Sequence, residues 1–311
     1  IRHLSYNSMG LDFADVNRDL VDDLVVVEMM ATGRAMKITQ DKDSFPKEEF
    51  IANRNPDARP QSGRNMLYLG RGDMTFSEVA YMVGLAASDW SWSSVFLDVD
   101  LDGFEDLLVT NGFQYDANDW DTQTRLGRLN MNPLQRRKSF FLYPKLDTPN
   151  QAFRNLAGKS FEGMGREWGF DSMIGGYGMA CGDLDNDGDL DLVVSNINSG
   201  VSIYRNNCSS PRLAIQLKGH GRNTSGTGAR LIVEGHEVTQ SLEMISGGRY
   251  MSSDQPIRVF AAREHTSHDV TVRWRSGQVS KLKQLESGYK YLISHPPEPP
   301  LVAPVVRPDP K

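Results

Sequence analysis

The sequence predicts an all-β chain in which an incomplete β-propeller is followed by a small β-sandwich-like domain. Three observations predict this fold class. An aspartate-rich loop recurs at a nearly constant interval, each interval holds four strand-like segments, and further short alternating segments follow the last loop. Four strands per repeat is the pattern of a propeller blade, and about seven short strands joined by Gly and Ser turns are typical of a sandwich or small barrel.

The aspartate-rich loops define the repeat. They begin at Asp15, Asp98 and Asp183, which are 83 and 85 residues apart. Each loop follows the pattern D-x-[DN]-x-D-x-x-x-D-L and runs into an apolar, strand-like segment. Two intervals of such similar length indicate an internal repeat, so we expect one blade-sized unit per interval.

The best-defined repeat contains all four predicted strands. The first follows the loop, the next two form a hairpin with a Gly-containing turn, and the fourth runs into the next loop. In that order they are residues 106–110, 151–155, 160–164 and 177–182. Insertions at roughly 31–62 and 113–149 lengthen the repeats. We expect both insertions to form loops on one face of the propeller, with helix potential at 122–138.

A different pattern begins after the third loop. Residues 212–294 form seven alternating segments separated by Gly and Ser turns. Residues 296–311 contain seven prolines, which favour an extended tail or a linker. We therefore expect propeller blades in 1–209, a separate β domain in 210–295 and a Pro-rich tail after it.

The alternating aspartates suit a hard cation. Ca²⁺ takes about six to eight oxygen ligands, and side chains at alternate positions of a tight loop can converge on one point. A glycine at position six, as at Gly103 and Gly188, permits the sharp turn. We expect two to three structural Ca²⁺ sites, with side-chain ligands at positions one, three, five and nine and a main-chain carbonyl at position seven. The predicted ligands are Asp98, Asp100, Asp102, Phe104 and Asp106 in the second loop, Asp183, Asp185, Asp187, Asp189 and Asp191 in the third, and Asp15, Asn17, Asp19, Val21 and Asp23 in the first.

Two other interpretations compete with a calcium-binding blade loop. An EF-hand loop begins in the same way, but it requires a Glu at position 12. That position is Val26, Val109 or Val194 here, and a β-branched strand follows instead of a helix. The loops could also be solvated acidic turns without metal. The first loop fits a metal least well, because Asn17 replaces an acid and Leu20 would be strained where a glycine is wanted.

Composition narrows the classes of function. The 311 residues carry a formal net charge of -6, which argues against nucleic acid as a partner. No apolar run approaches the roughly 18 residues of a membrane span. The sequence has no metalloprotease, serine-hydrolase or phosphate-loop motif. We expect Cys181 to be a buried free thiol, although a disulfide with Cys208 stays open.

The loops and the C-terminal segments resemble known families. D-x-D-x-D-G-x-x-D-L heading an apolar strand resembles the FG-GAP/VCBS repeats of integrin-type propellers, in which the loop binds Ca²⁺ and seven blades are usual. GRNTSGTGARLIV, SGGRYMSSD and VRWRSGQV, which begin at residues 221, 246 and 272, resemble the ASPIC/UnbV domain. The combination is similar to bacterial members of the cartilage acidic protein 1 family, which implies further blades before Ile1. One departure is Arg275, which stands where that family usually has a proline.

The expected function follows from the loops and the resemblance. We expect an exported, non-enzymatic, calcium-binding propeller that acts in recognition or adhesion, extracellularly or in the cell envelope (periplasm or outer surface). Its partner would be a protein or glycan ligand. The alternative is a propeller-based polysaccharide lyase or hydrolase with its active site mostly in the missing blades. Acid and base residues converging on the central channel from several blades would favour that enzyme.

Overall fold

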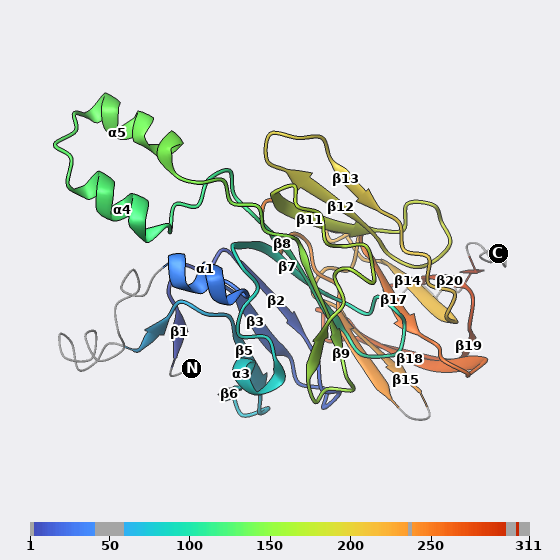
Figure 1. The fold of residues 1–311 in the computed structure, drawn as a ribbon. Helices are drawn as coiled ribbons and strands as arrows, with labels where there is room; N and C mark the ends of the chain where they lie inside the picture. Colours follow the sequence, from blue (N-terminus) through green and yellow to red (C-terminus); the bar gives the residue numbers. More distant parts are fainter. Residues whose placement is uncertain (1–2, 41–58, 236–237, 297–302, 305–311) are drawn as a thin grey trace.

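Strands dominate the regular structure, and they fall into six sheets among the described residues (Figure 1). Three sheets are blades, two form a sandwich, and one is a parallel pair of β1 (Leu4–Ser5) and β4 (Gln61–Ser62). The all-β propeller class predicted from the sequence is therefore confirmed. This computed structural model describes residues 3–40, 59–235, 238–296 and 303–304.

Each blade is an antiparallel sheet whose strands follow one another in chain order. The aspartate-rich loop is the hairpin between the first and second strands of every blade. The first blade consists of β2 (Gly10–Ala14), β3 (Asp23–Val27), β5 (Met66–Gly70) and β6 (Phe76–Glu78). The second consists of β7 (Ser91–Leu97), β8 (Asp106–Asn111), β9 (Gln151–Asn155) and β10 (Phe161–Gly163). The third consists of β11 (Gly176–Gly182), β12 (Asp191–Asn196) and β13 (Ser202–Tyr204).

The blade boundary differs by one strand from the sequence repeat. The sequence grouped 177–182 with the three strands before it, but this segment is β11, the first strand of the next blade. Its partner is β12, where Gly182 pairs with Asp191 across the loop. A short loop keeps its two flanking strands hydrogen-bonded to each other, so both strands belong to one sheet.

The first strands of the three blades pack side by side, with β7 between β2 and β11. This arrangement buries the middle blade on both faces. Val95 on β7 and Leu107 and Val109 on β8 are almost completely buried. The uninterrupted apolar run of β8 thus reflects a strand covered by neighbouring sheets, which differs from the simple alternation of a sheet with one solvated face.

The C-terminal region is a sandwich of two four-stranded sheets. All seven segments predicted from the sequence are strands. One sheet, ordered β17-β14-β20-β21, contains β17 (Ile257–Ala261), β14 (Arg212–Lys218), β20 (Lys290–Ser294) and β21 (Ala303–Pro304). The other, ordered β16-β15-β18-β19, contains β16 (Thr239–Glu243), β15 (Arg230–Glu234), β18 (Ser267–Arg273) and β19 (Val279–Glu286).

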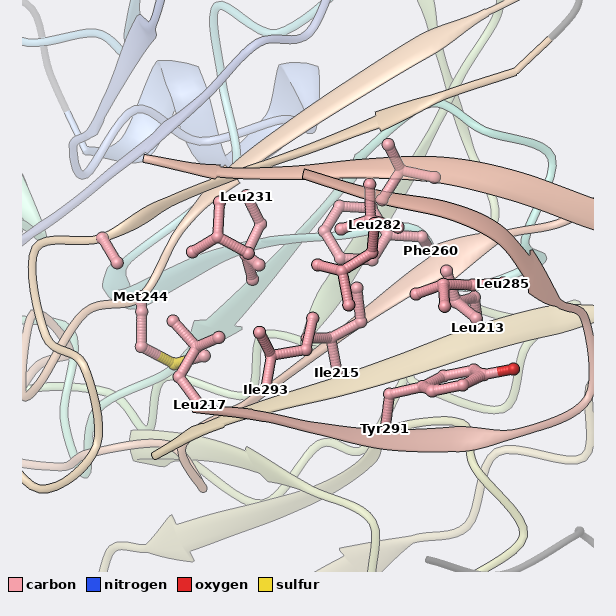
Figure 2. Close-up of a cluster of buried hydrophobic side chains, with 14 of the residues drawn as sticks. Leu213, Ile215, Leu217, Leu231, Met244, Phe260, Leu282, Leu285, Tyr291 and Ile293 are labelled. Carbon is pink, nitrogen blue, oxygen red and sulfur yellow. The ribbon is translucent and has the colours of Figure 1, made fainter. Parts of the chain in front are cut away.

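The sandwich core lies between these two sheets. Figure 2 shows Leu213 and Ile215 from β14 and Phe260 from β17 facing Leu231 and Leu282 of the opposite sheet. Truncating a fully buried Leu or Phe in such a core costs roughly 2–5 kcal/mol. The sandwich therefore has its own core.

A second core joins the sandwich to the blades. It combines Val95 and Met179 of the blades with Ala214, Ile257 and Val259 of the sandwich. Most of the predicted Pro-rich tail lies outside the described residues, and the predicted domain limits at 209 and 295 stay predictions. Within the described chain, no helix has the length and hydrophobicity needed to cross a membrane.

The insertions carry most of the helices, and both insertions connect the second and third strands of a blade. The first contains α1 (Arg34–Thr39), and the second contains α4 (Trp120–Gly127), α5 (Pro133–Ser139) and the 3₁₀ helix η1 (Phe140–Leu142). The short α3 (Ala80–Val83) follows β6. Gln40 Nε2 donates to Asp116 Oδ2 at 3.1 Å, which links the two insertions at one end of the blades. The helix potential at 122–138 is confirmed by α4 and α5, whereas residues 41–58 of the first insertion lie outside the described part.

Candidate metal centre

The three aspartate-rich loops share one backbone shape. In each loop the residues at positions four and six adopt left-handed conformations, with positive φ. The φ values are 63° and 67° at Arg18 and Leu20, 53° and 97° at Leu101 and Gly103, and 60° and 92° at Asn186 and Gly188. The strain expected at Leu20 is therefore present, because a β-carbon disfavours this region and only glycine enters it freely. The first loop keeps the shape of the other two despite that cost.

The aspartate at position one closes the loop on itself. The carboxylate of Asp98 accepts the backbone N–H groups of Asp102 at 3.0 Å and of Gly103 at 2.9 Å. Asp15 accepts the equivalent N–H groups of Asp19 and Leu20, both at 2.9 Å. The carboxylate at position one thus satisfies backbone donors that the tight turn would otherwise leave unpaired.

The aspartate at position nine ties the loop to the third strand of its blade. Asp106 Oδ2 accepts Val99 N–H at 2.9 Å, and its Oδ1 accepts Asn155 N–H, at the end of β9, at 2.8 Å. Asp23 and Asp191 accept the equivalent pairs at 2.8–3.0 Å. The two oxygens of this carboxylate therefore hold the aspartate's own strand, the loop and the end of the third strand together.

Two of the loops bring several carboxylate oxygens close together. Oxygens from Asp98, Asp100 and Asp106 all lie within 4.8 Å of one another, and so do oxygens from Asp183, Asp185 and Asp187. Two ligands on opposite sides of a Ca²⁺ ion are about 4.8 Å apart, because each lies about 2.4 Å from it. The donor sets of the second and third loops therefore fit a calcium ion. Among the described residues no such acidic group forms at the first loop, where Asn17 supplies an amide.

Family models match both halves of this architecture. Residues 50–109, which include the second loop, match the FG-GAP-like repeat, and residues 219–300 match the model described as ASPIC and UnbV. The chain carries an FG-GAP-like repeat and an ASPIC/UnbV domain. No curated protein matches it. The resemblance read from the sequence is confirmed at this level, while the likeness to the cartilage acidic protein 1 family stays a prediction.

Arginine side chains also face the acidic groups of the FG-GAP-like loops. Arg154 on β9 contacts Asp100 at 2.7 Å and Asp102 at 3.2 Å. Arg205, just after β13, contacts Asp185 at 2.5 Å. Both arginines are more than a third exposed, so solvent screens these ion pairs. They partly neutralise each loop from its outer side.

The third loop also contacts the C-terminal sandwich. Lys290 on β20 lies 3.2 Å from Asp183, and the Arg212 guanidinium on β14 donates to the Asp187 carbonyl at 2.8 Å. Asp189 is almost completely buried and its carboxylate lies 3.4 Å from Arg212. The side chain of Asp189 is not part of the converging group, and neither are those of Asp102 and Asp191, which were predicted as side-chain ligands.

An asparagine after each of these arginines connects neighbouring blades, and the sequence reasoning missed it. Asn155 Nδ2 donates to the carbonyl of Val16 in the first loop at 2.9 Å and to that of Glu105 in its own blade at 3.0 Å. Asn206 Nδ2 donates to the carbonyl of Val99 in the second loop at 3.0 Å. The signal was present in the sequence as Phe-Arg-Asn (153–155) and Tyr-Arg-Asn (204–206), at the third strand of two repeats.

Arg18, at position four of the first loop, makes a second connection between blades. Its Nη1 lies 2.7 Å from the buried carboxylate of Glu105 in the second loop, and its Nε donates to the Gly103 carbonyl at 2.5 Å. The guanidinium carbon also lies 5.5 Å from the centre of the Phe104 ring. The first two loops are thus held together by one arginine.

Burial raises the pKa of several loop carboxyl groups. It raises the pKa of Asp106 to about 8 and that of Asp23 to about 7, because the buried charged form loses its water. The pKa of Asp98 is also raised well above its usual range, first by burial and then by the charges of Glu105, Asp106 and Asp102. A bound dication would reverse this, because it stabilises the ionised form of every carboxylate around it.

Proposed function

We propose that this chain is a non-enzymatic, calcium-binding recognition module that works outside the cell or in the cell envelope. The observation that carries the proposal is the convergence of three carboxylates in each of two FG-GAP-like loops. Oxygen-only donor sets of this kind favour Ca²⁺ over softer metals. Millimolar calcium outside cells suits surface loops of moderate affinity.

Calcium would act on the structure of the blades. Asp98, Asp100 and Asp106 would hold one ion, and Asp183, Asp185 and Asp187 would hold another, with Phe104 and Asp189 offering carbonyls as predicted. The ion's charge would replace the repulsion between these carboxylates with attraction. Because Asp106 and Asp191 are already tied to third strands, an ion that orders the loop also orders the blade.

The end of the blades that carries the insertions is the best candidate for the recognition surface. Loops on a rigid scaffold commonly carry binding sites. A hollow of about 290 Å³ lies there, mostly beside the first insertion, lined by Lys37, Gln40, Arg64 and Tyr81 among others, with Asn118 from the second insertion. These hydrogen-bonding and aromatic groups match a polar ligand such as a glycan or a peptide.

A binding screen tests the proposed recognition. The whole chain is applied to glycan and protein arrays in calcium, together with an Arg64→Ala/Tyr81→Ala variant. We expect the natural chain to bind a ligand without altering it chemically. The variant should bind the same ligand at least tenfold more weakly. Exposed Asn130→Ala, outside the hollow, serves as the matched control and should bind normally. Turnover of a polysaccharide by the natural chain would overturn the non-enzymatic proposal.

A further inference from the structure

The second insertion forms an arm that projects from the propeller. We define the arm as residues 120–145, which contain α4, α5 and η1. Figure 1 shows α4 and α5, in green, extending away from the blades. Two irregular segments of the chain connect them to the blades. Most of the surface of both helices is therefore free of contacts with the rest of the described chain.

The arm is strongly basic although the whole chain is acidic. The arm contains six Lys and Arg residues and one acidic residue, Asp121, while the chain as a whole has a net charge of -6. All six side chains are exposed, and none forms an ion pair with a described residue. They are Arg125, Arg128, Arg136, Arg137, Lys138 and Lys145.

The same arm exposes large apolar side chains among these cations. Leu129 and Leu134 are 55% and 62% exposed at the turn between α4 and α5. Phe141 and Leu142 are 65% and 56% exposed nearer the base of the arm. Single exposed apolar residues are normal, but four within 14 residues of a projecting element indicate a contact surface.

The arm is ordered by local interactions and by its base. The Asp119 carboxylate caps α4 by accepting Thr122 N–H, and Asn132 with Gln135 forms a capping box that starts α5. At the base, Phe140 packs edge-on against Phe113 at 6.0 Å and Tyr115 at 5.2 Å. The exposed groups are thus presented on a preformed structure, which lowers the entropy lost on binding.

We propose that the arm docks on an anionic phospholipid surface. The cations would pair with lipid phosphates while Leu129, Leu134 and Phe141 enter the boundary between headgroups and acyl chains. Charge complementarity and the exposed apolar groups together favour this partner, because a soluble polyanion would satisfy only the cations. The proposal concerns binding at the membrane surface and does not depend on calcium in the loops.

Vesicle co-sedimentation tests the proposal. The natural chain is mixed with vesicles of phosphatidylcholine and phosphatidylglycerol in about a 2:1 ratio, and with vesicles of phosphatidylcholine alone. An Arg128→Gln/Arg136→Gln/Arg137→Gln variant removes three cations of the arm. Each cation near an anionic membrane strengthens binding roughly fivefold, so this variant should bind the mixed vesicles on the order of 100-fold more weakly.

A matched control separates the effect of the arm's cations from the effect of a change in the net charge of the chain. Arg273, Arg275 and Lys281 are exposed on the ASPIC/UnbV domain, and replacing them with Gln removes the same charge elsewhere. This control should bind the mixed vesicles like the natural chain. A Leu129→Ser/Leu134→Ser variant keeps every charge and should also bind more weakly. All variants are checked for unchanged melting temperature, since every substituted side chain is exposed.

The outcomes distinguish the proposal from its competitors. Binding to mixed vesicles that weakens with salt, needs phosphatidylglycerol and is lost in both arm variants supports it. Equal binding to both kinds of vesicle, equal loss in the control variant, or no vesicle binding at low salt would each overturn it. Retention on immobilised heparin without vesicle binding would assign the arm to a soluble polyanion instead.

Discussion

The aspartate at position nine shows how one side chain can support the fold and also lie in a candidate metal site. Both oxygens of Asp106 accept backbone N–H groups, one from the loop and one from the third strand. One of them also belongs to the converging group of the second loop, because a carboxylate oxygen has lone pairs for both. The closing acid is therefore required by the hairpin itself, whether or not an ion is bound.

Calcium affinity should depend differently on two neighbouring aspartates of the third loop. Both carboxylates lie 3.4 Å from Arg212, but only that of Asp187 belongs to the converging group. We expect Asp187→Ala to weaken calcium binding at this loop at least tenfold, and Asp189→Ala to change it less than threefold. Titration calorimetry of the two variants, each beside the natural chain, gives this comparison. A larger loss in Asp189→Ala would contradict the assignment of its carbonyl as the ligand.

The aspartate-rich loops could be located from the sequence because their pattern is local. Alternating aspartates with a glycine at position six define the turn within a few residues. Arg154 and Asn155 were missed because their side-chain partners lie far away in the chain, at least 50 residues in each case. Contacts between blades are set by packing, and no short motif encodes them.

At the scale of the element, each blade begins as a hairpin around its aspartate-rich loop. The later strands of the blade then add to the second strand of this hairpin. The sequence predicted the strands of the second repeat closely, since β8, β9 and β10 nearly coincide with the expected segments. It assigned β11 to the wrong blade, because a repeat counted from the loop starts one strand later than the sheet. Sequence periodicity fixes the length of a unit and leaves its starting point undefined.

Blade stacking should depend on the asparagine at the end of the third strand. Asn155→Ala removes two buried hydrogen bonds and leaves the carbonyls of Val16 and Glu105 without this donor. We expect the free energy of unfolding to fall by about 2–4 kcal/mol, measured by urea denaturation in calcium. Asn130→Ala, on the exposed surface of the arm, should change it by less than about 0.5 kcal/mol. Equal effects of the two substitutions would show that Asn155 does not join the blades.

At the scale of the whole molecule, the blades and the C-terminal sandwich are joined by a shared core and by polar contacts. They share a core, and Lys290 and Arg212 of the sandwich reach the third aspartate-rich loop. Composition and periodicity predicted both parts, but neither indicated that one would contact an aspartate-rich loop of the other. That contact joins residues 107 positions apart, so only the folded chain reveals it.

Without calcium, stability should decrease as the pH rises. Burial raises the pKa of Asp106 and Asp189 to about 8 and that of Asp23 to about 7, from 3.8 when unfolded. Between about pH 4 and pH 8 the folded chain then holds more protons than the unfolded chain, so each unit of pH lowers the unfolding free energy. Melting in EDTA across this range should show a falling melting temperature. Saturating calcium should flatten the dependence, and a chelated protein that becomes more stable toward pH 8 would contradict this assignment.

The most direct test of the central claim is a thermal melt of the whole chain with saturating calcium and with EDTA, paired with elemental analysis. We predict about two calcium ions per chain and a melting temperature higher by on the order of 10 °C in calcium, because each saturated site adds roughly 2–3 kcal/mol. An Asp100→Asn/Asp185→Asn variant should lose most of that difference. A chain without bound calcium whose melting temperature is the same in both buffers would contradict the claim that these loops are metal sites.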